Sequence, residues 1–137
     1  LRSAKSSAAQ LSSAPGFPGL ADNGSYPADT QVAVGSQQIV EMTNTLVGIY
    51  GRDGRRLENF PMTDTLGNAG DDVSDPQIAW DPTSGAWLAA AMNLSTNSTQ
   101  IAISDSSDPR GVWWDYSYSY GPAQVGRRRG SSPARAT

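Results

Sequence analysis

Carboxylates are the residues of this sequence whose type and spacing could do chemistry. Asp29 and Asp75 open two similar stretches 46 residues apart, Asp-Thr-Gln-Val-Ala-Val and Asp-Pro-Gln-Ile-Ala-Trp. If the two stretches fold alike, both carboxylates stand just before a strand, where together they could bind a cation or line a ligand pocket. The structural alternative is that each aspartate caps its own turn, Asp75 before Pro76 in particular.

A second group of acids lies next to Asp75 in the sequence. Asp71 and Asp72 offer, together with Asp75, the oxygen ligands that Ca²⁺ prefers. The run Asp-Asp-Val-Ser-Asp does not match an EF-hand loop. The sequence therefore leaves Ca²⁺ open as a bound ion and predicts no other cofactor.

The composition narrows the remaining chemistry. The 137 residues include no Cys and no His, which excludes a disulfide scaffold, a Cys/His zinc site and a Ser-His-Asp triad. Four Trp, five Tyr and a hydrophobic fraction of 37% argue against disorder throughout. Catalysis, if there is any, would have to use carboxylate, Tyr, Ser, Lys or Arg.

The charge is divided between an acidic body and a basic end. The net charge is -3, and four of the ten Lys and Arg residues, Arg127, Arg128, Arg129 and Arg135, lie close to the C-terminal end. An acidic body disfavours nucleic acid as a partner, because such binding needs a basic surface. The longest weakly charged run, residues 86–103, is interrupted by polar residues, so we expect no membrane span.

Short β-branched and aromatic runs alternate with turn residues through the middle of the chain, which predicts strands. We expect them at Gln31–Val34, Ile39–Thr43, Leu46–Tyr50 and Arg56–Phe60, then at Gln77–Trp80, Ala86–Met92, Thr99–Ser104 and Val112–Tyr120. Residues 1–25 are rich in Ser, Pro and Gly and predict a linker. Residues 121–137 are Arg-rich without periodicity and predict a disordered tail.

Four short antiparallel strands repeated at this spacing are typical of β-propeller blades. We therefore expect an all-β fold, with two four-stranded antiparallel blades, about 29–60 and 75–120, within a domain of residues 26–120. A β-sandwich with accidental internal similarity is the alternative. A propeller has roughly four to eight blades, so two blades do not close a ring. We expect a fragment of a longer protein, because the repeat pattern stops abruptly at Gly121-Pro122; several copies that assemble are the alternative.

The last predicted strand alternates aromatic and polar residues. Trp114, Tyr116, Tyr118 and Tyr120 fall on one face, because successive side chains of a strand point to opposite sides. This stripe suits either packing between sheets or a platform for a sugar ring.

Several segments, in order and at blade spacing, resemble the first two blades of secreted microbial sialidase-like β-propeller proteins. They are Tyr26-Pro-Ala-Asp-Thr-Gln-Val-Ala-Val-Gly, Ile39-Val-Glu-Met-Thr-Asn, Ile49-Tyr-Gly-Arg-Asp-Gly, Ser74-Asp-Pro-Gln-Ile-Ala-Trp-Asp-Pro-Thr-Ser-Gly-Ala-Trp and Ile103-Ser-Asp-Ser-Ser-Asp-Pro-Arg-Gly-Val-Trp-Trp. The resemblance covers about residues 26 to 120. It implies an extracellular protein whose partners are the remaining blades of its parent chain and a glycan or an extracellular protein.

The run Ser106-Ser-Asp108-Pro-Arg-Gly111-Val-Trp113 is similar to the Asp-box, a hairpin motif of sialidase blades. One residue is inserted before the Gly, and the Thr of the motif is missing. The resemblance implies that Asp108 accepts backbone N–H bonds, that Gly111 relaxes the turn and that Trp113 packs beneath it. This role is structural, and Asp-boxes lie away from the catalytic face.

The same family implies the residues a sialidase needs: an arginine cluster, an acid/base Asp, and a Tyr nucleophile paired with Glu. The Arg-Ile-Pro motif is missing, and Arg52, Arg55, Arg56 and Arg110 fall in predicted hairpin turns on the other face. We therefore expect a non-catalytic binding module. The alternative is the N-terminal part of a sialidase-like glycoside hydrolase whose catalytic residues lie outside this chain.

Overall fold

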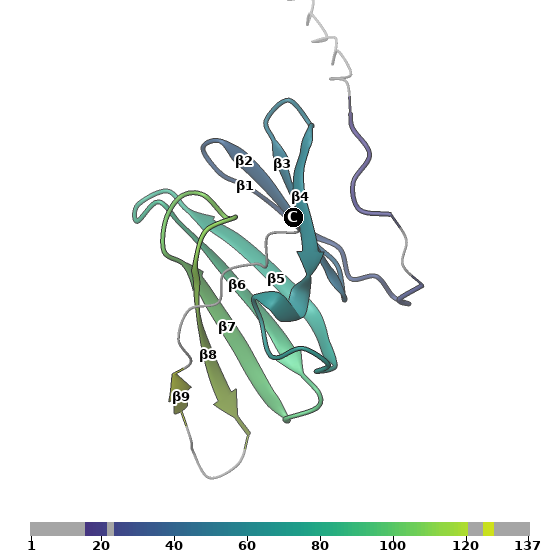
Figure 1. The fold of residues 1–137 in the computed structure, drawn as a ribbon, viewed down its shortest axis with the longest axis vertical. Coiled ribbons are helices and arrows are strands. Elements are labelled where there is room, and N and C mark those ends of the chain that lie inside the picture. The colour runs from purple at the N-terminus through teal and green to yellow at the C-terminus, as the bar shows by residue number, and fades with distance from the viewer. Residues whose placement is uncertain (1–15, 22–23, 121–124, 128–137) are drawn as a thin grey trace, which may run out of the picture.

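The computed structural model describes residues 16–21, 24–120 and 125–127, which form two antiparallel sheets (Figure 1). Sheet A holds β1 (Gln31–Val34), β2 (Gln38–Met42), β3 (Leu46–Gly51) and β4 (Arg56–Pro61), in sequence order. Sheet B holds β5 (Val73–Asp81), β6 (Ala86–Asn93), β7 (Ser98–Ser104), β8 (Trp113–Ser119) and β9 (Val125–Arg127). A single 3₁₀ turn, η1 (Met62–Asp64), lies in the connection between the sheets. No helix in this part of the chain is long and apolar enough to cross a membrane.

The all-β prediction is confirmed, and all eight predicted strands are present. The largest boundary difference is at β5, which begins at Val73 rather than at Gln77. Its pairing with β6 shifts register between Ser74 and Gln77, with Pro76 inside the shift. Proline donates no ladder hydrogen bond and is tolerated at such a bulge. The bulge breaks the alternation, which hides the first part of the strand from a sequence pattern.

Sheet B also has a fifth strand that the sequence analysis did not predict. β9 pairs antiparallel with β8, with Arg127 opposite Tyr116. Val125–Arg127 of the predicted tail form this strand, because the edge of β8 offers unpaired backbone groups to a nearby segment. Most of the other residues of the predicted linker and tail lie outside the described residues.

The two sheets bury one continuous core between them. Sheet A contributes its face with Val40 and Ile49, and sheet B contributes Trp87, Ala89 and Ala91, all almost fully buried. The small side chains of Ala89 and Ala91 let the sheets approach closely.

Unlike faces of the two repeats meet in this core. In sheet A the buried face is the one that carries Ala33, while Val32 points away and is 57% exposed. In sheet B the opposite set of positions faces the core, namely Ile78 and Trp80. The 46-residue offset makes Val32 equivalent to Ile78, so sheet B presents to sheet A the face that sheet A itself turns outward.

The outer face of sheet A is covered in part by residues 16–21, which belong to the predicted linker. The ring of Phe17 lies 5.2 Å from that of Tyr50. The Leu20 N–H donates to Glu41 Oε2 at 2.7 Å, and the Tyr50 hydroxyl donates to the same oxygen at 3.0 Å. Burial, together with the hydrogen bond and the negative charge of Glu41, raises the pKa of Tyr50 to about 12.

Gly35 supplies the first test of the core, because its turn lies directly against an indole. A Cβ at Gly35 would lie 2.4 Å from Trp87 Cζ2. We expect Gly35→Ala to lower the free energy of unfolding by about 1 to 3 kcal/mol through overpacking, measured by urea denaturation. Gly16→Ala is the control, since no atom lies within 4 Å of its Cβ position, and it should change stability by less than about 0.5 kcal/mol. Equal effects of the two substitutions would contradict this packing.

The raised pKa of Tyr50 predicts how the free energy of unfolding changes at alkaline pH. Its pKa is raised from 10.0 to about 12 in the folded protein, so the folded state holds the proton more tightly than the unfolded state does. This contribution is complete below pH 10 and is lost as the pH rises toward about 12. We expect Tyr50→Phe to flatten the fall of unfolding free energy across that window, and Tyr118→Phe to preserve it. An unchanged slope in Tyr50→Phe would refute the assignment.

Candidate functional site

Asn44 joins the two aspartates that the internal repeat makes equivalent. It lies in the turn between β2 and β3, and its Nδ2 donates to Asp29 Oδ2 at 2.9 Å and to the carbonyl oxygen of Pro27 at 2.8 Å. Its Oδ1 accepts from the Asp75 backbone N–H at 2.9 Å. One amide side chain thus connects the start of sheet A with the start of sheet B.

The backbone is the same at both aspartates. Asp29 has φ 48° and Asp75 has φ 54°, both in the left-handed region that Asp and Asn tolerate better than most residues. Both stand two residues before the matching glutamines, Gln31 and Gln77. The repeat seen in the sequence is therefore also a repeat of conformation, and the structure places the two predicted site residues at the same end of the neighbouring sheets.

The chemistry of this end is that of hydrogen-bond acceptors with negative charge. Asp29 is partly exposed and Asp75 is exposed, so their carboxylates meet solvent. Tyr26 precedes Pro27, and its side chain is completely exposed. We refer to Tyr26, Asp29, Asn44 and Asp75 as the acidic end site. Sequence reasoning missed Asn44 and Tyr26; a polar residue in the turn between two predicted strands was the only signal for Asn44.

Of the other predicted metal candidates, Asp71 accepts hydrogen bonds through its carboxylate, and Asp72 donates one through its backbone. Asp71 Oδ2 accepts from the Asn68 backbone N–H at 2.8 Å and from Asn93 Nδ2 at 2.8 Å. The Asp72 N–H donates to Ser95 Oγ at 2.8 Å. Within residues 16–21, 24–120 and 125–127, no three acidic side chains are grouped so that they could hold a metal ion. Asp71, Asp72 and Asp75 are therefore not brought together as a Ca²⁺ site.

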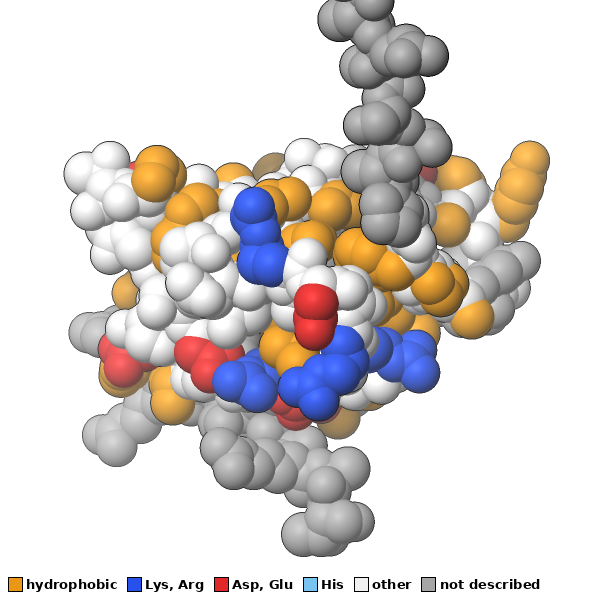
Figure 2. Space-filling model, turned by 90° about the horizontal axis from the view of Figure 1, so that it is seen from above, with side chains coloured by type: hydrophobic (Ala, Val, Ile, Leu, Met, Phe, Trp, Pro, Cys, Tyr) orange, Lys and Arg blue, Asp and Glu red, His pale blue; other side chains and the backbone are white. Residues whose placement is uncertain are grey.

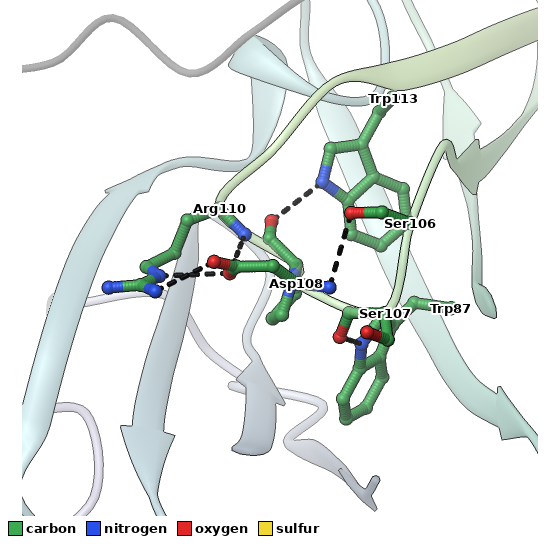
Figure 3. A network of polar contacts seen from close by, with 7 residues as sticks. Trp87, Ser106, Ser107, Asp108, Arg110 and Trp113 are labelled. Carbon is green, nitrogen blue, oxygen red and sulfur yellow. Dashed lines mark hydrogen bonds and ion pairs between the residues drawn. The ribbon is translucent and has the colours of Figure 1, made fainter. Parts of the chain in front are cut away.

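The Asp-box-like turn lies between β7 and β8, and Asp108 organises it (Figure 3). Its Oδ1 accepts from the Arg110 N–H at 3.0 Å, and its Oδ2 pairs with Arg110 Nη2 at 2.7 Å. The Asp108 N–H donates to Ser106 Oγ at 3.3 Å. The hydrogen bonds that the Arg110 guanidinium donates to the Asp108 carboxylate raise the pKa of Arg110 above its ordinary value.

Two buried indoles hold this turn against sheet B (Figure 3). Trp113 Nε1 donates to the carbonyl oxygen of Pro109 at 2.8 Å, and Trp87 Nε1 donates to that of Ser107 at 3.0 Å. Gly111 does not have a positive φ. Its missing side chain matters because a Cβ would lie 3.2 Å from the carbonyl oxygen of Asp108. The turn is thus a packed structural element.

The arginines lie at the opposite end of the sheets from the acidic end site. Figure 2 looks onto this end and shows the basic side chains there. Arg52 and Arg55 lie in the turn between β3 and β4, Arg56 begins β4, and Arg110 lies in the β7–β8 turn. Arg52 Nη1 donates to the carbonyl oxygen of Gly35 at 2.9 Å. Among residues whose side chains the structure describes, these four are the only Lys or Arg.

Comparison with known proteins adds no relative to this picture. No protein-family model, no curated protein and no solved structure matches the chain. The resemblance to sialidase-like propellers therefore stays a prediction, and the function has to be argued from the geometry.

Asn44 supplies the test of the acidic end site. Asn44→Ala removes the donor to Asp29 and the acceptor of the Asp75 N–H, and we expect a loss of about 1 to 3 kcal/mol in unfolding free energy, measured by urea denaturation. Asn59→Ala, at an exposed position of β4, is the matched control and should cost less than about 0.5 kcal/mol. If Asn44→Ala is as mild as the control, Asn44 does not join the two repeats.

Proposed function

We propose that this protein is a non-catalytic extracellular module of β-propeller type that binds a glycan or a protein ligand at the acidic end site. The observation that carries the proposal is the bridge that Asn44 makes between the carboxylate of Asp29 and the backbone N–H of Asp75, because it joins equivalent residues of the two repeats. Tyr26, next to Pro27 in the chain, adds an exposed ring.

The propeller part of the proposal is supported by how the sheets stack. Successive blades of a propeller are related by a rotation in one sense, so each buries one face on the preceding blade and the other face on the next. The same relation brings the Ala33 face of sheet A against the Ile78 face of sheet B. The closest approach of the sheets is between β1 and β5, the first strands of the two repeats, as expected for blades that radiate from an axis.

The binding part of the proposal is supported by the chemistry of the exposed groups. Ionised carboxylates accept hydrogen bonds from sugar hydroxyls and also pair with Lys or Arg of a protein ligand. The left-handed backbone at Asp29 and Asp75 is of the kind that concentrates at functional sites. The Asn44 bridge holds this backbone in place before a ligand arrives, which reduces the entropy lost on binding.

The position of the arginines supports a role without catalysis for this chain. A sialidase-type mechanism needs a guanidinium group that grips the substrate carboxylate. Arg52, Arg55, Arg56 and Arg110 lie at the other end of the sheets, so they do not supply that group to the acidic end site. Asp29 and Asp75 are left as groups that bind and orient.

Binding to a glycan array, followed by calorimetric titration with the best glycan, tests this function. We expect Asp75→Asn to weaken binding about tenfold or more, the size of one lost charge-assisted hydrogen bond. Tyr26→Ala should also weaken binding, because it removes the exposed ring. Asn tolerates the backbone of Asp75, so the fold is preserved. Asp53→Asn removes a carboxylate from the β3–β4 turn at the opposite end and should leave affinity unchanged. Basic peptides are titrated against the protein in parallel, which distinguishes a protein ligand from a glycan.

Two results would count against the proposal. One is an absence of binding to every glycan and every basic peptide tested. The other is binding that Asp75→Asn and Tyr26→Ala leave unchanged, since the ligand would then occupy a different surface.

A further inference from the structure

Across β5–β8, the outer face of sheet B is largely apolar, and three rows of its side chains contain no charged residue. The rows are set by the strand register: Ala79, Leu88, Ile103 and Trp114; then Gln77, Ala90, Ile101 and Tyr116; then Ser74, Met92, Thr99 and Tyr118. Leu88 is 39% exposed and Tyr118 is 56% exposed. A continuous apolar surface of this kind on a sheet marks an interaction site.

The internal repeat indicates which kind of surface would pack on this face. Ala79 is equivalent to Ala33 through the 46-residue offset, and Ala33 packs into the core against sheet B. The outer face of sheet B is therefore the counterpart of the face of sheet A that is already buried. Within the chain, the Ala33 face of sheet A packs on the face of sheet B that carries Ile78 and Trp80. A face of that second type would therefore fit the outer face of sheet B.

The chain carries that complement on its other outer face. Val32 and Val34 of β1 are the equivalents of Ile78 and Trp80, and they are 57% and 52% exposed. The interface between sheets A and B is made of an Ala33-type face and an Ile78-type face. The two outer faces of the molecule are again one face of each type. β1 carries no charged residue, and the row of Ala79, Leu88, Ile103 and Trp114 on sheet B carries none either. The acid nearest to Val32 is Glu41 of β2, which already accepts hydrogen bonds from Leu20 and Tyr50.

Residues 16–21 leave the necessary part of sheet A open. They contact Glu41 of β2 and Tyr50 of β3, and the side chains of β1 remain exposed. Within the chain the sheets approach most closely between β1 and β5. A second copy that repeats this packing would use mainly the exposed side chains of β1. The strands covered by residues 16–21, β2 and β3, lie farther from the contact between the sheets.

We propose that a second copy of this chain docks β1, through Val32 and Val34, on the outer face of sheet B. The contact repeats between copies the packing of sheet A on sheet B within one chain. Such a contact is heterologous and closes a ring if the rotation fits. A propeller of roughly four to eight sheets corresponds to about two to four copies. The inference rests on the proposed propeller architecture and is independent of the ligand at the acidic end site.

The test is the mass in solution, measured by sedimentation velocity and light scattering on the full chain. We expect a closed oligomer of about two to four copies. Val32→Lys and Leu88→Lys should each abolish it, since the contact would have to desolvate the added ammonium group. Mixed in equal amounts, the two variants should form a one-to-one dimer, because one intact Val32 face and one intact Leu88 face remain. Thr83→Lys, at an exposed position of the β5–β6 turn, is the control and should assemble normally.

Other results would overturn the proposal. A monomeric wild-type chain excludes it, and so does an oligomer that survives Val32→Lys, which would mean that two sheet B faces meet each other. If circular dichroism shows that Leu88→Lys fails to fold, Tyr118→Ser takes its place in the mixing experiment, and Val34→Lys can likewise replace Val32→Lys. Asp75→Asn should assemble like the wild type, which separates a failure here from a failure of ligand binding.

Discussion

The packing of Trp87 between the two sheets is the interaction on which the rest of the structure depends. Its side chain is completely buried and lies against Gly35 in the β1–β2 turn. Its ring packs at a tilt of 56° against that of Trp80, with the ring centroids 4.9 Å apart. Its Nε1 also holds the carbonyl oxygen of Ser107. One indole thereby connects sheet A, sheet B and the Asp-box-like turn. Aromatic side chains suit this task because they bury a large area with few rotatable bonds.

Asn44 does at one end of the sheets what Trp87 does at the other. Trp87 connects the sheets by apolar packing near the hairpin turns, while Asn44 connects them by hydrogen bonds where β1 and β5 begin. With both ends joined, the relative position of Asp29 and Asp75 is defined by contacts on either side. A ligand at the acidic end site would then meet a surface that is already ordered. The conformational entropy of these residues would be lost during folding and not during binding.

The two ends of the sheets differ in charge. The described arginines gather among the hairpin turns, where Arg52 and Arg110 hold a backbone carbonyl and a carboxylate. The acidic end site lacks such neighbours among the described side chains, so its negative potential is not cancelled locally. The outer sheet faces carry no comparable charge and suit contact with another sheet. Ligand and partner would therefore use different surfaces.

The sequence by itself determined the strands, because alternation of side chains and turn residues are local patterns that survive any tertiary arrangement. It also determined the repeat, which places Asp29 and Asp75 at equivalent positions with the same left-handed backbone. It did not reveal the bulge in β5, since Pro76 breaks the alternation there.

Only the tertiary structure decided which faces meet and which groups touch across the sheets. Asn44 reaches a partner 31 residues away, Phe17 covers Tyr50 from a segment that resembles a linker, and β9 joins an edge from the predicted tail. Such contacts depend on how whole sheets are positioned, and no local pattern carries that information. A short sequence window specifies the direction of a side chain from its own strand, while its partner is decided only when the second sheet is packed in place.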